Sequence, residues 1–183
     1  MPVTINGSTG VSLVQDSTIT SAKILDGTIA NTDINASAAI EASKLSGTGK
    51  VLQVVTSETT TTTTTTGSSF VATNLSASIT PNSTSSRIVI LATAMLNNTS
   101  SNSWAYGTIY RDSTDLGPSN TKGLVGVYSQ GGDIHVNGSI VLTDSPNTTS
   151  AVTYKYYIRA YGGTAKFNQQ SQKTKITLME IGA

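Results

Sequence analysis

Serine and threonine hydroxyls are abundant in this sequence of 183 residues, but the partners that would activate one of them for catalysis are few. The sequence contains no cysteine, which excludes disulfides, thiolate catalysis and Cys-ligated zinc. Its single histidine, His135, alternates with Ile134 and Val136 and should face away from both. We expect an exposed strand histidine; a metal shared by three copies on a threefold axis is the alternative. The sequence therefore predicts no metal site and no cofactor.

The acidic residues do not form a recognisable catalytic pair. Asp112 and Asp115 are close in sequence, but we expect them in a short polar turn, where solvent and backbone NH groups bind their carboxylates. No Gly-x-Ser-x-Gly nucleophile elbow is present. Turns rich in Asp and Asn also offer oxygen ligands for calcium, but the acids lack the spacing of a calcium loop. We expect no enzymatic activity, and a glycan-degrading enzyme is the disfavoured alternative.

Three aromatic residues are better candidates for a site. Trp104, Tyr106 and Tyr110 fall on one face of an alternating stretch. Aromatic faces beside amide and hydroxyl groups suit sugars, whose CH groups stack while their OH groups find donors and acceptors. The alternative is that these rings fill the core of the fold or a subunit interface. The sequence thus nominates them as candidate glycan contacts.

The elements that must position these rings are strands. Short alternating or aliphatic runs recur about every ten to fifteen residues, with Asn, Gly, Ser, Asp or Pro between them. This spacing, with no helical pattern between the runs, predicts an antiparallel β-sandwich, most simply a jelly roll of eight or nine strands. The threonine tract 59–66 should be an edge strand or strand-like loop, and the aliphatic run 87–96 a central strand buried on both faces. The other predicted strands are 51–55, 70–79, 104–110, 122–128, 134–142, 152–161, 165–168 and 175–181.

The first 49 residues have a different texture. They contain no aromatic residue, and isolated aliphatics recur in three repeats of about ten residues. Such a segment cannot offset the entropy of folding alone, so regular spacing favours order induced in an oligomer. We expect three chains to intertwine here, apart from a short helical stretch around 36–45, and to stack these residues on a shared axis. The predicted stalk core is Ile19, Ile24, Ile29, Ile34, Ile40 and Leu45.

The composition argues against nucleic acid and membranes as binding partners of this protein. The charged fraction is 11% and the formal net charge is +1, so no field steers nucleic acid or an anionic membrane to the protein. The longest nearly continuous apolar run, 88–96, is too short to span a bilayer, which takes about 20 residues. The N-terminus lacks the pattern of a secretory signal. We therefore expect a soluble protein that is neither exported by the usual route nor inserted in a membrane.

Several short motifs resemble fibre and spike proteins of tailed bacteriophages, especially those of cyanobacterial and marine phages. They are the opening MPVTINGSTGV, the repeats ILDGTI and NTDINA, KVLQVV at 50–55, RDSTD at 111–115 and the ending ITLMEIGA. The resemblance implies a homotrimer with an intertwined N-terminal stalk, the arm (residues 1–49), and a C-terminal jelly-roll knob (residues 50–183). It also implies that the arm attaches to another virion protein and that the knob faces outward, often toward a host surface glycan. The family has no common catalytic residues.

The chain is short for a long tail fibre. Thirty repeat residues reach only about 100 Å even when fully extended. With this length, the resemblance implies a tail fibre of the short or distal kind, assembled in the host cytoplasm, whose knob contributes to host adsorption. A head fibre or capsid decoration protein is the alternative.

Overall fold

A computed structural model describes residues 29–30, 33–35, 38, 50–118 and 122–182. The chain divides into two units, Met1–Ser46 and Gly47–Ala183, and each is described by itself. In the first unit the described residues include a small turn, in which Asp33 Oδ2 accepts a hydrogen bond from the Ala30 amide at 2.8 Å. Ile29 and Ile34 are 55% and 41% exposed in the single chain. The remaining predicted stalk residues, Ile19, Ile24, Ile40 and Leu45, lie outside the described residues.

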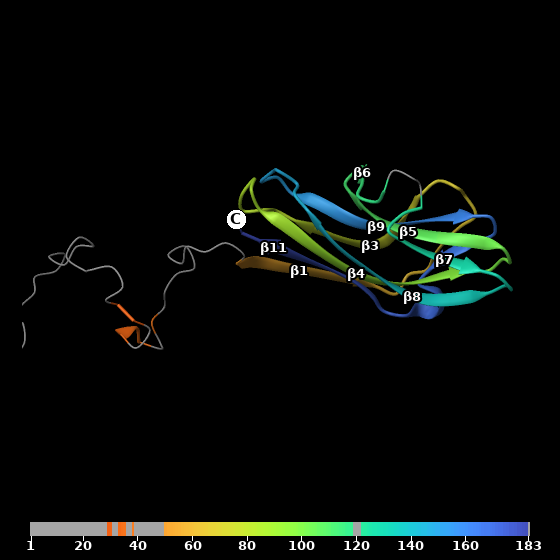
Figure 1. Cartoon of the computed structure of the whole chain (residues 1–183), viewed down its shortest axis with the longest axis horizontal. Helices are drawn as coiled ribbons and strands as arrows, with labels where there is room; N and C mark the ends of the chain where they lie inside the picture. Colours follow the sequence, from red (N-terminus) through yellow and green to blue (C-terminus); the bar gives the residue numbers. More distant parts are fainter. Residues whose placement is uncertain (1–28, 31–32, 36–37, 39–49, 119–121, 183) are drawn as a thin grey trace, which may run out of the picture. The chain divides into compact units, whose positions relative to one another are not determined.

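The second unit consists of strands (Figure 1). It also contains a short 3₁₀ turn, η4 (Gln169–Ser171), and the described residues contain no α-helix. No helix in the described part of the chain is long and apolar enough to cross a membrane. The strands are β1 (Val51–Thr59), β2 (Thr63–Thr65), β3 (Val71–Ile79), β4 (Arg87–Asn98), β5 (Ser103–Arg111), β6 (Thr114–Asp115), β7 (Val125–Ser129), β8 (Ile134–Asp144), β9 (Val152–Tyr161), β10 (Ala165–Phe167) and β11 (Thr174–Ile181).

The strands pair into two antiparallel sheets that face each other. The first has the order β1-β11-β4-β8, with β10 and β2 continuing it beside the far end of β4. The second has the order β3-β9-β5-β7, with the short β6 on the outer end of β5. The chain passes repeatedly from one sheet to the other, and the strand orders β1-β11-β4-β8 and β3-β9-β5-β7 are those of a jelly roll. The predicted all-β, jelly-roll fold is confirmed.

The core lies between the sheets and follows from the alternation in each strand. Inward positions carry Ile, Leu, Val, Ala and two tyrosines, while outward positions are mostly polar. The largest fully buried side chains are Leu75, Ile79, Ile88, Ile90, Leu96, Ile109, Tyr154, Tyr156, Ile158, Phe167, Ile176 and Leu178.

Two predictions about single strands have different outcomes. The threonine tract does contain an edge strand, because β2 pairs only with β10 at the border of the first sheet. The prediction that 87–96 is buried on both faces is wrong for the first half of β4. There Arg87 and Thr93 are exposed and Val89 and Leu91 are half-buried, since the outer face of this sheet has no second layer over it in the single chain.

Candidate binding surface

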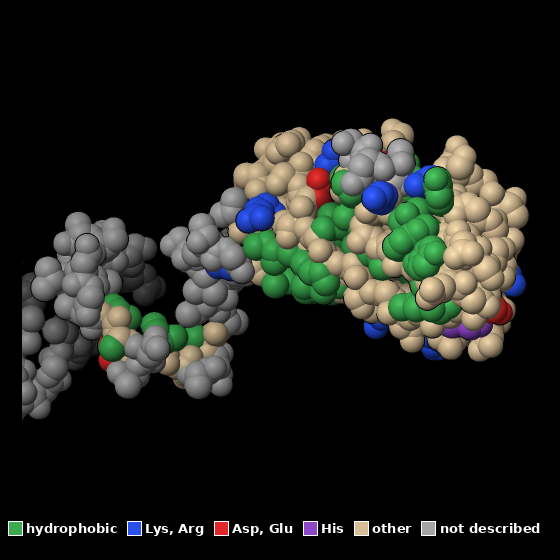
Figure 2. All heavy atoms as spheres, turned by 45° about the vertical axis from the view of Figure 1, so that its right-hand side comes forward, with side chains coloured by type: hydrophobic (Ala, Val, Ile, Leu, Met, Phe, Trp, Pro, Cys, Tyr) green, Lys and Arg blue, Asp and Glu red, His purple; other side chains and the backbone are tan. Residues whose placement is uncertain are grey.

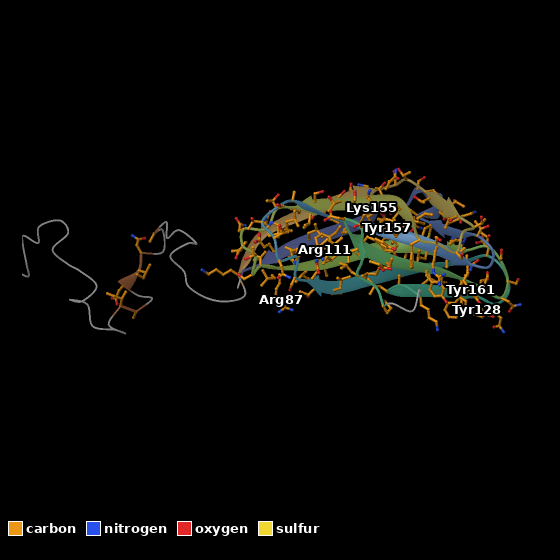
Figure 3. The ribbon with its side chains drawn as sticks, turned by 90° about the horizontal axis from the view of Figure 1, so that it is seen from above. Arg87, Arg111, Tyr128, Lys155, Tyr157 and Tyr161 are labelled. Carbon is orange, nitrogen blue, oxygen red and sulfur yellow. The ribbon has the colours of Figure 1, made fainter. Side chains whose placement is uncertain are left out.

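Three exposed rings lie side by side on the outer face of the second sheet. Trp104 on β5 is directly opposite Tyr128 on β7 and, on its other side, opposite Tyr161 on β9. The three side chains are 36%, 40% and 63% exposed, and the Trp104 and Tyr128 ring centroids are 4.9 Å apart. Figure 3 labels both tyrosines close together at one end of the sandwich. We call these three residues the aromatic row.

A buried ring supports the aromatic row from the side of the sheet centre. Tyr106, two residues along β5, is only 7% exposed and stacks on Trp104 with ring centroids 5.6 Å apart. Its neighbour across the strand is Gly126, where an added Cβ would lie 2.8 Å from Tyr106 Cδ1. The absence of a side chain on Gly126 therefore creates the space that the Tyr106 ring fills.

A buried cation completes this support. Arg159, opposite Tyr106 on β9, is 7% exposed, and its guanidinium lies 4.9 Å from the Tyr106 ring centroid and 5.5 Å from that of Phe70. Its Nη1 donates a hydrogen bond to the Ser68 carbonyl at 3.0 Å. Two aromatic faces compensate the desolvation of this charge, so the rings and the guanidinium hold one another in place.

The ring contacts continue along β5, away from the aromatic row. Tyr110 stacks on Tyr157 with centroids 4.1 Å apart and meets the edge of Phe70 at 6.3 Å. Burial, followed by the negative charge of Asp115, raises the pKa of Tyr110 above its ordinary value. Tyr110 therefore stays a protonated, packed ring and does not belong to the exposed row.

The three aromatic residues predicted from the sequence thus share one face of β5, but they have different roles. Trp104 is exposed, whereas Tyr106 is buried under it and Tyr110 is engaged with Tyr157. Tyr128 and Tyr161, the two rings that join Trp104 in space, come from other strands. Only the pairing register of β7, β5 and β9 identifies them, and the sequence does not contain that register.

Polar groups form the rim of the aromatic row. Tyr128 Oη donates a hydrogen bond to Asn102 Oδ1 at 3.0 Å, in the turn before β5. The turn after Tyr161 contains Gly162 and Gly163, both with positive φ; a Cβ on Gly163 would lie 2.3 Å from that of Ser100. These two turns therefore pack closely, and the glycines are required for it.

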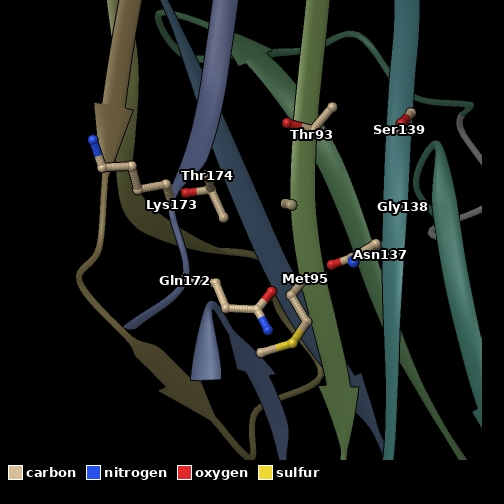
Figure 4. Close-up of a pocket in the computed structure, with 9 residues that line it drawn as sticks. Thr93, Met95, Asn137, Gly138, Ser139, Gln172, Lys173 and Thr174 are labelled. Carbon is tan, nitrogen blue, oxygen red and sulfur yellow. The ribbon is translucent and has the colours of Figure 1, made fainter. Parts of the chain in front are cut away.

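A separate groove lies on the first sheet. It has a volume of about 260 Å³ and opens where β4 runs past η4 to the start of β11 (Figure 4). Its walls are Thr93, Ala94, Met95, Asn137, Gly138, Ser139, Gln172, Lys173 and Thr174. The groove is polar and has no aromatic wall, so it lacks the stacking surface of the aromatic row.

The remaining nominated chemical groups serve the fold. Asp112 Oδ1 accepts the Thr153 amide at 3.0 Å, and Asp115 Oδ1 accepts the Thr108 hydroxyl at 2.7 Å. His135 is exposed, as expected, with Nε2 3.5 Å from Asp133 Oδ2. In the described part of the chain, no three acidic or histidine side chains gather as they would around a metal ion.

Two further carboxylates, one buried and one half-buried, belong to hydrogen-bond networks. Glu180 is fully buried and accepts hydrogen bonds from Gln53, Asn82 and Ser86 at 2.6–2.7 Å. Burial alone would raise its pKa, but these hydrogen bonds outweigh burial, and the pKa of Glu180 lies below its ordinary value. Glu180 is therefore an ionised, saturated acceptor that ties β1 and the β3–β4 turn to β11.

The second network joins the two sheets. Arg111 Nη1 lies 2.8 and 2.7 Å from the two carboxylate oxygens of Asp144, and Tyr154 Oη donates to Asp144 Oδ2 at 2.7 Å. Burial and the hydrogen bond to Asp144 raise the pKa of Tyr154 strongly, so its hydroxyl remains a donor. This arrangement fixes the end of β8 against β5 and β9.

Comparison with known proteins adds little. No protein-family model matches the chain, and no curated protein matches its sequence. Among solved structures, a mutant VP2 protein of infectious bursal disease virus, from derived T=1 particles, matches with a TM-score of 0.37 and 10% identity over 80% of this chain and 40% of that chain. The VP2 subviral particle of the same virus matches with a TM-score of 0.32 and 12% identity over 72% of this chain and 40% of that chain. This chain spans less than half the length of either matched chain.

Proposed function

We propose that this chain is a structural protein of a virion: a homotrimeric phage tail fibre that is anchored to another virion protein by its arm and whose knob contributes to adsorption by binding host surface glycans. The motif resemblance supports the family, and the jelly-roll knob agrees with what that resemblance implies. The observation that carries the adsorption role is the exposed aromatic row of Trp104, Tyr128 and Tyr161 on its buried support.

The location of the row within the knob supports this role. The first strand of the knob begins at Val51, which pairs with Ile181. Ile181 in turn pairs with Arg87. Figure 3 labels Arg87 at one end of the sandwich and Tyr128 and Tyr161 at the other. The rings therefore lie at the end of the knob remote from the point where the arm joins, where a receptor-binding surface would face outward.

The chemistry of the row suits a neutral sugar. Its rings offer flat apolar faces, and the Asn102 amide and the tyrosine hydroxyls supply donors and acceptors at the rim. A millimolar site contributes only about 4 kcal/mol, but three sites per trimer and several trimers per particle multiply the effect. Weak individual contacts are thus sufficient for adsorption.

We also propose that the knob is not an enzyme. Each carboxylate among the described residues accepts a hydrogen bond or an ion pair that stabilises a turn or a strand contact. Two groups with shifted pKa values agree with this view: the lowered pKa of Glu180 keeps it ionised, and the raised pKa of Tyr154 keeps it protonated. Such groups are poorly suited to exchange protons near neutral pH.

The test is glycan and host-cell binding by the purified trimer. Trp104→Ala and Tyr161→Ala should each lower binding about tenfold or more, because loss of one stacking ring removes more than about 1 kcal/mol per site and the loss multiplies across three sites. Tyr161→Phe, which keeps the ring, should retain most of the binding. Val136→Ala, which truncates an exposed apolar side chain on the other sheet, is the control. Unchanged binding by both Ala variants would reject the aromatic row as the site.

The tail location needs its own measurement, a copy count against the major capsid protein by quantitative mass spectrometry. A few to a few tens of copies per particle would support a tail fibre. Copies in the hundreds, or a number matching the capsid vertices, would favour the head fibre or decoration role instead.

A further inference from the structure

Part of the outer face of the first sheet is apolar, whereas a solvent-facing sheet is usually polar. Val51 and Val54 on β1 and Val141 on β8 are 53%, 56% and 68% exposed. Between them, four apolar side chains at outward positions of the central strands β4 and β11 are half-buried: Val89, Leu91, Met179 and Ile181. We call this surface the apolar face; its members are Val51, Val54, Val89, Leu91, Val141, Met179 and Ile181.

The pairing register makes this face continuous. Val54 lies opposite Met179, and Met179 lies opposite Val89 on β4. In the next outward row Leu91 lies opposite Val141. Figure 2 shows hydrophobic side chains gathered over a connected area at the end of the sandwich where β1 begins. Contiguous exposed apolar surface of this kind marks a contact with another molecule.

The apolar face also has a hollow shaped for a side chain. Arg87, Val89, Thr143 and Ile181 enclose about 110 Å³ on this surface. Its walls are aliphatic apart from the Thr143 hydroxyl and the Arg87 head group. An aliphatic side chain from a neighbouring molecule fits this chemistry better than a polar ligand does.

The arm indicates what covers the face. Its repeated aliphatics cannot be buried by one chain, and the two that the structure describes, Ile29 and Ile34, are 41–55% exposed. The arm meets the knob at Lys50, whose carbonyl accepts a hydrogen bond from the Gly182 amide at 2.8 Å, beside Val51 and Ile181. Copies joined through their arms would hold these edges near one another at a high effective concentration. The nearest available partner for the apolar face is thus another copy of the same chain.

The two central rows of the apolar face carry no charge. The rows that contain Val54 and Leu91 are completed by uncharged residues, Thr143, Thr177 and Thr56. The charged side chains of Glu58 and Lys173 pair with each other at 3.1 Å at the far end of β1. Arg87, in the row of Val51 and Ile181, and Lys175, in the row beyond Leu91, are exposed charges at the two borders of these rows. Identical copies can therefore approach through the rows of Val54 and Leu91 with little like-charge repulsion.

We infer that the apolar face is the knob's contact surface between copies of this chain in the trimer. This inference rests on the proposed trimer but not on the proposed adsorption. It assigns the first sheet to assembly and leaves the second sheet, with the aromatic row, open to solvent.

The absence of cysteine from the chain permits a direct test. Single-cysteine variants Val54→Cys, Val141→Cys and Val136→Cys of the full chain would be labelled with a maleimide under native conditions. Val136 is the matched control, because it is an exposed valine on the same strand as Val141 but outside the apolar face. We expect Val54→Cys and Val141→Cys to react about tenfold more slowly than Val136→Cys, because labelling there requires the contact to open.

A second measurement introduces a charged side chain into the apolar face and follows dissociation of the trimer. Val141→Glu should shift the trimer towards monomers on dilution, measured by light scattering or native mass spectrometry, while Val136→Glu should not. A trimer in which all three cysteines react at one rate and Val141→Glu dissociates like the parent would overturn the inference and leave the trimer intact. A parent chain that is monomeric at all concentrations would instead reject the proposed trimer itself.

Discussion

Trp104 lies flat on Tyr106, with ring centroids 5.6 Å apart and ring planes inclined by 4°. The exposed Trp104 ring is therefore supported by the buried Tyr106 ring. The Arg159 guanidinium packs against the Tyr106 ring, which occupies the space left by the missing side chain of Gly126. A binding ring fixed in this way loses little conformational freedom when a ligand stacks on it, which favours weak but specific contacts.

Filling the gap at Gly126 should disturb this support. A Cβ in Gly126→Ala would lie 2.8 Å from the Tyr106 ring, so the ring must move, at a cost of about 1–3 kcal/mol. Urea unfolding should show the loss, and the fluorescence of Trp104, the single tryptophan, should change. Gly131→Ala is the matched control, because nothing lies within 4 Å of its added Cβ. Equal stability and equal spectra for the two variants would contradict this packing.

Two ion pairs within the described part of the knob should differ sharply in their contribution to stability. In the Arg111–Asp144 pair the side chains are 24% and 12% exposed, whereas in the Lys173–Glu58 pair they are 73% and 54% exposed. Asp144→Asn should lower the free energy of unfolding by about 2–4 kcal/mol, because it leaves Arg111 without its charged partner. Glu58→Gln should cost at most about 0.5 kcal/mol. Urea unfolding of both variants at one salt concentration tests this, and similar losses would contradict it.

Much of the fold, but less of the site, could be predicted from the sequence. Alternation places Tyr154, Tyr156 and Ile158 inward and predicts β9 with its observed ends, because the hydrophobic period is set within one strand. The aromatic row is different, since Trp104, Tyr128 and Tyr161 meet only through the pairing of three strands. Cross-strand register depends on contacts distant in sequence, and periodicity does not encode it.

The start of β7 also depends on contacts that are distant in sequence. The sequence predicts a strand over 122–128, but β7 begins at Val125. Gly123 has a φ of 69° and sits so close to the sheet that an added Cβ would lie 2.5 Å from the Gly107 carbonyl oxygen. Here tertiary packing determines where the strand begins, in spite of the apolar pattern around it.

The stability of the knob should fall in acid through Glu180. Its pKa in the folded protein lies below the ordinary value of 4.5, so its ionised form stabilises the folded state above that pH. This stabilisation should be lost progressively as the pH falls from the ordinary value through the lowered one. Asp133, whose pKa is also lowered, by its hydrogen bond from Asn97 and by nearby His135, contributes in the same direction.

The variant Glu180→Gln separates the contribution of Glu180 to the acid sensitivity from that of the other titrating groups. The substituted amide presents NH₂ to a cluster of donors from Gln53, Asn82 and Ser86, so we expect a loss of about 1–3 kcal/mol at pH 7. The variant should also show a flatter stability profile between pH 6 and about pH 3, measured by urea unfolding. Asp133→Asn is the control and should keep most of the slope. A slope unchanged in Glu180→Gln would mean that other groups carry the acid sensitivity.

The repeat aliphatics of the arm should be required for assembly but not for the knob. Ile29 and Ile34 are exposed in one chain, and burial of an aliphatic side chain stabilises by about 1.5–3 kcal/mol, so a shared core in three chains would gain several times this amount. Ile29→Asp with Ile34→Asp should abolish stable trimers in native mass spectrometry while circular dichroism still shows a folded, β-rich knob. Asn35→Asp with Ala38→Asp adds the same two charges at exposed positions of the same segment and leaves both isoleucines in place. If the trimer survives the isoleucine substitutions, or is lost equally in both pairs, the arm does not associate through these side chains.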